Sequence, residues 1–195
     1  MILFNTASFR CAEMTAEAIP RLQEFFESNP EYHVAVDGRP PRPEEAREEF
    51  ESLLPPGWPF KKKWVLDFSG ADGGMIGMAD VISNLFAPGV WHIGLFVIAT
   101  PLHGGGAARQ VYEGLEDWMQ VNGARWLRLG VVAGNARAER FWEKLGYVEV
   151  RRRLQVPMGE RTNDIRVMVK PLATAALPEY LSLVARDRKE PHESH

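Results

Sequence analysis

The sequence has little cysteine, no long apolar run and no excess of basic charge, three features that would each indicate a particular class of protein. Cys11 is the only cysteine among 195 residues, so no disulfide forms within the chain, and we expect a cytoplasmic location. No apolar run approaches the roughly 20 residues that cross a bilayer, so no membrane partner is expected. With 23 basic and 26 acidic residues the formal charge is −3, which disfavours nucleic acid as a partner.

What remains is the composition of an ordinary folded domain. Hydrophobic residues make up 45% of the chain and charged residues 25%, and 195 residues is the size of one domain. We predict one domain over residues 1–172, followed by a C-terminal extension over 173–195 that consists of a short helix and a polar tail. Cys11 is expected to be a small buried apolar residue and not a nucleophile.

The first third of the chain predicts a short strand and two amphipathic helices. A strand over Ser8–Cys11 precedes a helix that Thr15 caps and that ends before Asn29-Pro30. A second helix begins at Glu44 and ends before Pro55. Its predicted apolar stripe consists of Ala46, Phe50, Leu53 and Leu54.

The middle of the chain predicts a β-meander. Alternating large apolar residues indicate a strand over Trp64–Phe68, and Ala71–Gly74 is a turn signal after which Met75–Ile82 pairs back. The next predicted strand, Val90–Ile98, contains Gly94, and a glycine inside a strand often marks a bulge.

The segment after Ile98 predicts a strand–turn–helix–strand unit. The helix runs to about Val121, where Asn122-Gly123 closes it, and a strand follows over Trp126–Val132. A short helix after Asn135, two strand-like runs over 148–156 and 165–169, and a short helix over 178–186 complete the chain. One parallel crossover inside an antiparallel meander indicates an α+β fold, with a mixed, mostly antiparallel twisted sheet and flanking helices.

Three consecutive glycines, Gly104, Gly105 and Gly106, join the strand ending at Ile98 to the helix that follows. Bare backbone N–H groups at a helix start, together with the positive end of the helix dipole, form a site for an anion such as phosphate. Three glycines also cost conformational entropy unless the turn needs the room. The turn therefore predicts a phosphorylated small-molecule ligand.

Two other glycine-rich phosphate-binding motifs fit the sequence less well. No Gly-x-x-x-x-Gly-Lys-Ser/Thr string is present, which excludes a P-loop. Gly104 and Gly106 match the first two glycines of a dinucleotide-binding motif, but Arg109 takes the third position. Leu127–Leu129 also stands where an acidic residue is expected, so a Rossmann-type nicotinamide enzyme is kept only as a third alternative.

Two motifs together resemble those of one enzyme family. His103–Ala108 resembles the Gln/Arg-x-x-Gly-x-Gly/Ala signature of the GNAT superfamily of acyl-CoA-dependent N-acyltransferases. Asn135–Tyr147 is similar to the family's second signature, an asparagine followed by alanine, an aromatic pair and a closing Gly-aromatic. The resemblance covers most of the chain, from about Ser8 to Lys170, and implies a GNAT-like fold with acetyl-CoA as the co-substrate.

The resemblance implies a role for each part of the cofactor site. Amide groups of the glycine turn would hold the pyrophosphate of coenzyme A, and the strand before the turn would pair with the pantetheine arm near a bulge at Gly94. Asn135 would bond that arm, and the aromatic pair would pack near the thioester. The implied cofactor-binding residues are Phe96, Val97, Ile98, His103, Gly104, Gly105, Gly106, Ala107, Ala108, Arg109, Asn135, Phe141 and Trp142.

The chain departs from the family pattern at two positions. His103 stands in place of the signature's Gln or Arg, and a histidine, mostly neutral at pH 7, adds little charge to phosphate binding. Trp142 stands where many relatives have a tyrosine that protonates the leaving thiolate, and an indole N–H cannot do this. A thiolate still leaves tolerably without full protonation, so activity survives the change, but the acid is left unassigned.

Acyl transfer to an amine also requires a base, because an amine of lysine type is almost fully protonated at pH 7. Asp80 and His92 are the candidates, since regular alternation directs both to one face of the sheet. We group them with Asn135 as the catalytic residues, and a backbone N–H near Val97 is the expected oxyanion donor.

The predicted function is transfer of an acetyl group to a primary amine of a small molecule or protein, by direct attack in a ternary complex. A non-catalytic acyl-CoA sensor is the alternative, because no clear acid–base pair is present. Residues before Trp64 and the loop Ser83–Gly89 are expected to shape the acceptor pocket. The pattern predicts no metal site, and it leaves open whether the Leu177–Val184 segment packs within a monomer or in a homodimer.

Overall fold

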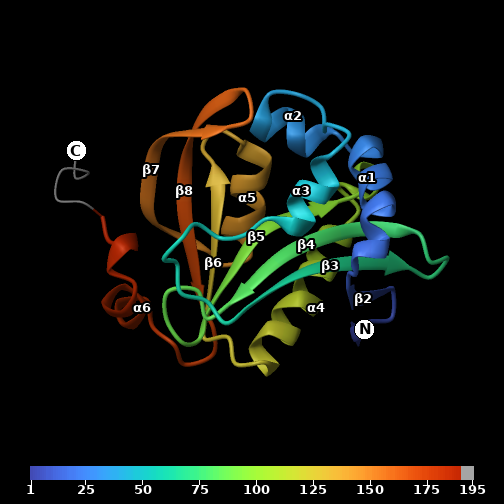
Figure 1. Cartoon of the computed structure of the whole chain (residues 1–195). Helices are drawn as coiled ribbons and strands as arrows, with labels where there is room; N and C mark the ends of the chain where they lie inside the picture. Colours follow the sequence, from blue (N-terminus) through green and yellow to red (C-terminus); the bar gives the residue numbers. More distant parts are fainter. Residues whose placement is uncertain (190–195) are drawn as a thin grey trace.

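The computed structural model, which describes residues 1–189, is built on one eight-stranded twisted sheet with helices on both faces (Figure 1). The strand order is β1-β2-β3-β4-β5-β6-β8-β7, and all neighbours are antiparallel except β5 and β6. The α+β fold with one parallel pair is therefore confirmed.

The first half of the sheet is a meander built by the N-terminal part of the chain. Its strands are β1 (Ile2–Asn5), β2 (Phe9–Glu13), β3 (Lys62–Gly70), β4 (Met75–Ser83) and β5 (Val90–Ile98). Trp64, Leu66 and Phe68 face the core on the side of α4 (Ala107–Val121), as the alternation predicts. Cys11 is fully buried in the same core, and burial raises the pKa of its thiol far above the usual range, so it is no nucleophile.

The second half of the sheet is formed after α4. It consists of β6 (Trp126–Val132), β8 (Arg161–Pro171) and β7 (Val148–Met158), and α5 (Ala136–Lys144) connects β6 to β7. The C-terminal helices α6 (Leu177–Leu183) and η3 (Ala185–Asp187) lie beside this half in Figure 1. Tyr180 and Val184 pack in a cluster with Trp126 and Val169, so the extension belongs to the core as far as it is described.

Helices cover the two faces of the sheet differently. Residues of α4 and α5 pack in the core on one face, and α1 (Ile19–Ser28) and α3 (Glu45–Glu51) pack on the other with side chains such as Val65, Met78 and Leu95. The short helix α2 (Glu31–Asp37) lies between the pair α1 and α3 and the edge of the sheet formed by β8 and β7, above α5 in Figure 1. Side chains from helices α2 and α3 therefore reach the centre of the sheet.

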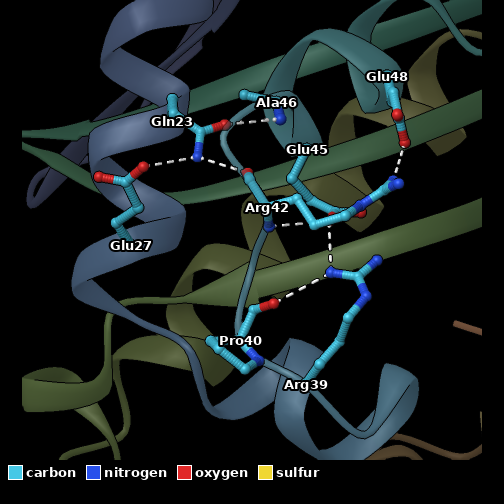
Figure 2. Close-up of polar contacts among 8 residues, drawn as sticks. All are labelled: Gln23, Glu27, Arg39, Pro40, Arg42, Glu45, Ala46 and Glu48. Atoms are coloured by element: carbon cyan, nitrogen blue, oxygen red, sulfur yellow. Dashed lines mark hydrogen bonds and ion pairs between the residues drawn. The ribbon is translucent and has the colours of Figure 1, made fainter. Parts of the chain in front are cut away.

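A polar network fixes α3 against α1 (Figure 2). Glu45 Oε2 accepts hydrogen bonds from Nη1 of Arg39 at 2.8 Å and from the backbone N–H of Arg42 at 3.1 Å. Gln23 Oε1 accepts from the N–H of Ala46 at 3.0 Å, and its Nε2 donates to the carbonyl of Arg42 at 2.8 Å. The two arginines and these hydrogen bonds outweigh the effect of burial and lower the pKa of Glu45 to about 2.

Four details differ from the sequence-based expectations in the N-terminal third. Strand β1 and helix α2 were not predicted. Helix α1 ends at Ser28, as Asn29-Pro30 predicted, but Pro30 is also the N-cap of α2. Thr15 makes no side-chain cap, and α3 ends at Glu51, which leaves Leu53 89% exposed and outside the apolar stripe. The polar tail predicted beyond Lys189 lies outside the described residues.

Candidate active site

The parallel strands β5 and β6 pair only along the first part of their length. Val90–Ile93 align with Trp126–Leu129, and beyond these residues the two strands separate. At the same point Asp80 pairs with Leu95 and Val81 with Ile93, so Gly94 is the extra residue of a β-bulge. An added Cβ at Gly94 would lie 3.3 Å from Oδ2 of Asp80, so this carboxylate fills the space that a side chain would need.

Three adjoining cavities open around this separation. The groove, of about 310 Å³, lies between the separated strands and extends to Trp58 and Arg153. The donor cavity, of about 340 Å³, follows Phe96–Ile98 to His103 and Gly104. The acidic cavity, of about 210 Å³, lies under α2 and α3 and is lined by Asp37, Glu45, Glu49 and Asp80, with His33, Tyr32, Val36, Gly94, Leu95 and Met158.

The glycine turn at the end of the donor cavity leaves its amide groups free. No backbone N–H group from Gly104 to Arg109 donates a hydrogen bond to another group within residues 1–189. Gly104 and Gly106 have φ of +82° and +84°, a conformation that other residues rarely adopt, and no atom lies within 4 Å of an added Cβ at either. The turn has the unpaired donors, the open space and the helix start that an anion site needs.

His103 is held by the strand before the turn. Its Nε2 lies 2.7 Å from the carbonyl oxygen of Ile98 and donates to it, while Nδ1 is buried without a partner among the described residues. The carbonyl of Ile98 is thus already engaged. Arg109 forms an exposed ion pair with Glu113 at 2.7 Å, and Arg137 lines the donor cavity from α5.

Asn135 and the aromatic pair line the donor cavity from α5. Oδ1 of Asn135 accepts a hydrogen bond from the N–H of Ala138 at 3.2 Å and caps the helix, so its Nδ2 donors are available to a ligand. Phe141 stacks parallel to Phe96 with ring centroids 6.1 Å apart. Trp142 is buried at the junction of the donor cavity and the groove, where it also contacts Phe96 edge-on.

Asp80 is part of a buried charged group that includes a residue the sequence did not indicate. Its Oδ2 is 3.3 Å from Nζ of Lys63, which also donates to the carbonyl of Glu49 at 3.0 Å. Oδ1 of Asp80 and Oε1 of Glu49 are buried without hydrogen-bond partners in the described part of the chain. Burial and the neighbouring Asp80 raise the pKa of Glu49 to about 7, and burial also raises the pKa of Asp80.

The two carboxyl groups lie close enough for a hydrogen bond between their side chains, which requires a proton on one of them. Glu49 is one of several glutamates in α3, and nothing in the local sequence separates it from its exposed neighbours such as Glu48 and Glu51. Only the packing of α3 on β4 brings it to Asp80.

His92 lies in the groove and not in the acidic cavity. Its Nδ1 is 3.0 Å from the carbonyl oxygen of Arg128, to which its N–H donates. Burial and the guanidinium of Arg128 lower the pKa of His92 to about 3, so its imidazole is neutral at pH 7 and binds a proton weakly. Asp80 and His92 therefore face the same side of the sheet but line different cavities.

Tyr32, on α2, is a second residue that the sequence did not indicate. It is the side chain that lines all three cavities, and its hydroxyl makes no hydrogen bond within residues 1–189. Burial and the nearby carboxylates, Glu49 first among them, raise the pKa of this phenol, which keeps it protonated. It lies in a helix that was not predicted, so the sequence offered no reason to place it near Trp142.

One group of potential metal ligands lies at the rim of the acidic cavity. Ligand atoms of His33, Asp37 and Glu45 lie within 4.8 Å of one another. Glu45 is already engaged by Arg39 and Arg42, and burial lowers the pKa of His33. The absence of a metal site stays a prediction.

Comparison with known proteins agrees with this geometry. The model of the acetyltransferase (GNAT) family matches residues 20–147, which is more than half of the chain. The chain belongs to this family, and it is an acyltransferase. The family uses acetyl-CoA, which agrees with the free amides of the glycine turn and not with a nicotinamide enzyme.

Solved structures with this fold come from several bacteria. An acetyltransferase from Thermus thermophilus is 22% identical, with a TM-score of 0.65, covering 88% of this chain and 100% of that one. Spermidine N-acetyltransferase from Vibrio cholerae, solved with CoA and spermine, is 15% identical, with a TM-score of 0.65 and coverages of 85% and 96%. Ribosomal-protein-S18-alanine N-acetyltransferase from Escherichia coli is 18% identical, with a TM-score of 0.62 and coverages of 87% and 97%.

These identities establish the fold and do not identify the acceptor. No curated protein sequence matches this chain significantly. Among residues 1–189, no helix combines the length and the apolar character needed to span a membrane.

Proposed function

We propose that this protein transfers an acetyl group from acetyl-CoA to a primary amine, by direct attack of the amine in a ternary complex. The observation that carries the proposal is the run of unpaired amides from Gly104 to Arg109 at the end of a cavity that leads into the separation of β5 and β6. Acetyl-CoA supplies the acetyl group as an activated thioester.

The donor cavity offers complementary groups along its length. Amides of the glycine turn would hold the pyrophosphate, and Arg137 adds a positive charge beside them. Backbone groups of Phe96 would pair with the pantetheine arm, to which Nδ2 of Asn135 would also donate. The thioester end would then lie near Trp142, at the entrance to the groove.

Proton removal from the amine is assigned to Asp80 and Glu49. A base with a pKa of about 7, such as Glu49, is half ionised at neutral pH and can take up a proton there. The cavity that these carboxyls line contains Gly94 and Leu95, so it opens onto the groove where an acceptor amine would lie. His92, with a pKa near 3, serves as a polar wall of the groove in this proposal.

Tyr32 is the proton donor that we assign to the leaving thiolate. Its position at the junction of all three cavities and its free hydroxyl support this role, and the phenol is protonated at neutral pH. It would replace the acid that Trp142 cannot provide. The oxyanion donor is left unassigned, because the register of β4 and β5 directs the backbone N–H of Val97 to Met78.

A non-catalytic acyl-CoA sensor is the second candidate, favoured by Trp142 in the place of the usual tyrosine. Turnover separates the two functions. The test measures free thiol released from acetyl-CoA with a panel of primary amines, for the wild type, Tyr32→Phe and Gly106→Glu. Gly123→Glu is the matched control, since Gly123 also has a positive φ and open space around it but lies at the far end of α4.

Transfer by the wild type and the control, a loss of about 100-fold in kcat for Tyr32→Phe, and no cofactor binding by Gly106→Glu are expected. Wild-type binding of acetyl-CoA without any turnover would establish the sensor. Unchanged binding by Gly106→Glu would show that the donor site is elsewhere.

A further inference from the structure

The end of the groove farthest from the glycine turn is basic and aromatic. Trp58, His92, Arg128 and Arg153 line this end, and no carboxylate is among the residues that line the groove. Its chemistry thus differs from that of the acidic cavity, which four carboxyl residues and no cationic side chain line. The proposed acetyl transfer uses neither the arginines nor Trp58.

Arg128 is neutralised by a buried partner. Its Nε and Nη2 donate to the two carboxylate oxygens of Asp187 at 2.7 and 3.1 Å, and the hydroxyl of Tyr180 donates to the same carboxylate at 2.6 Å. Asp187 is fully buried, so its capacity to accept hydrogen bonds is largely used by these contacts.

Two further arginines beside this pair have no comparable partner. Arg153, whose side chain is 27% exposed, has its ion-pair contact with Asp187 at 3.8 Å and makes no hydrogen bond within residues 1–189. Arg186 lies flat over Trp58 and Phe86, with its guanidinium 4.1 and 4.4 Å from the ring centroids, and its side chain likewise donates to no acceptor there. Burial and the charge of Arg128 lower the pKa of both.

Guanidiniums at a half-buried site that donate no hydrogen bond to a carboxylate favour a ligand with a negative charge. Each guanidinium presents N–H donors in a planar fork that matches a carboxylate, and Trp58 holds them in place, because Arg153 also lies over its ring at 6.0 Å. The groove between this basic end and Leu95 is also lined by apolar side chains, such as Val36, Val156 and Met158, which suits a methylene chain.

We infer that the acceptor amine carries a carboxylate, which Arg153 and Arg186 bind beside Trp58 while the amine lies at Asp80 and Glu49. The two charged regions adjoin, since the groove and the acidic cavity share Gly94, Leu95 and Met158. Leu95 is three residue steps after His92 along β5, about 10 Å at the rise of a strand, so the amine and the carboxylate are at opposite ends of a short chain. This inference rests on the proposed acetyl transfer.

The test compares acceptors matched in length with acetyl-CoA as donor. We expect wild-type kcat/KM for 6-aminohexanoate to exceed that for hexylamine by about 10- to 100-fold, the effect of a charged hydrogen-bonded contact. Cadaverine, with an ammonium in place of the carboxylate, should be poorer still. Arg153→Gln should lower the rate with 6-aminohexanoate far more than the rate with hexylamine and so remove the preference. Arg186→Gln should reduce the preference.

Arg152→Gln is the control, because Arg152 is an exposed neighbour that pairs with Glu149 away from the groove. Equal wild-type rates for the two acceptors, or equal losses for both in Arg153→Gln, would overturn the inference while the acetyl transfer stands. Failure of every amine would overturn the proposed function itself.

A last arm compares succinyl-CoA with butyryl-CoA. If Arg153→Gln changes only the choice between these donors, the carboxylate belongs to the acyl group, and the assignment to the acceptor is wrong.

Discussion

The most informative single substitution is Glu49→Gln, because it tests the buried carboxyl pair through stability and through activity. In the folded protein the pKa of Glu49 is raised from 4.5 to about 7 by burial and by Asp80. Between these two values the folded state binds a proton that the unfolded chain has released, so stability falls as pH rises through this window and is level above it. At about 1.4 kcal/mol per pKa unit, the fall due to Glu49 is about 3 kcal/mol.

The assay is denaturant unfolding of the wild type and of Glu49→Gln at pH 5 and at pH 8. The wild type should lose about 3 kcal/mol more than the variant between these pH values, because glutamine has no proton to release. Glu51→Gln is the matched control in the same helix, since Glu51 is exposed and pairs with Arg47 at 3.1 Å. The same pH dependence in the wild type and in Glu49→Gln would refute the assignment of a raised pKa to this carboxyl.

The activity of Glu49→Gln should change in the same pH range. In the wild type kcat/KM should rise with an inflection near pH 7, because the ionised form of Glu49 accepts the proton. The variant should lack this inflection and lose about 100-fold or more in kcat at pH 8. An unchanged pH–rate profile would leave Glu49 with a structural role and assign proton removal to another group.

Three further substitutions test the donor site and the C-terminal segment. Gly106→Ala and Gly123→Ala both place a Cβ at a positive φ, so each should cost about 1 kcal/mol of stability, while only Gly106→Ala weakens acetyl-CoA binding in a thermal-shift titration. Asn135→Asp keeps the oxygen that caps α5 but removes the Nδ2 donors, so the melting temperature should hold while the KM for acetyl-CoA rises. Asp187→Asn leaves Arg128 as an uncompensated buried charge and should destabilise the fold by about 3–5 kcal/mol, measured by urea unfolding.

The parts of the fold that the sequence predicted are those that local patterns encode. Strand β6 begins and ends at the predicted residues, and α4 ends at Val121 as predicted. Both follow from apolar periodicity and from glycines at the ends of elements, which are properties of a few neighbouring residues. The bulge at Gly94 was likewise indicated by a glycine inside a strand.

The parts that could not be predicted depend on contacts between distant segments. Glu49 acquires its raised pKa only because α3 packs on β4 beside Asp80, and Tyr32 reaches the cavities only because α2 forms after Pro30. Arg153 is left with only a 3.8 Å contact to Asp187 because Arg128 binds that carboxylate at 2.7 Å and so joins η3 to β6. Periodicity and motifs carry no information about such pairings.

The packing of η3 against the groove has a consequence for how the preference for an acceptor amine can change. Arg186 contacts Trp58 from η3, at the basic end of the groove. The amides for acetyl-CoA lie instead on the turn before α4, at the end of the donor cavity. Substitutions near the end of the chain can therefore retune which amines are accepted without disturbing how the thioester is held.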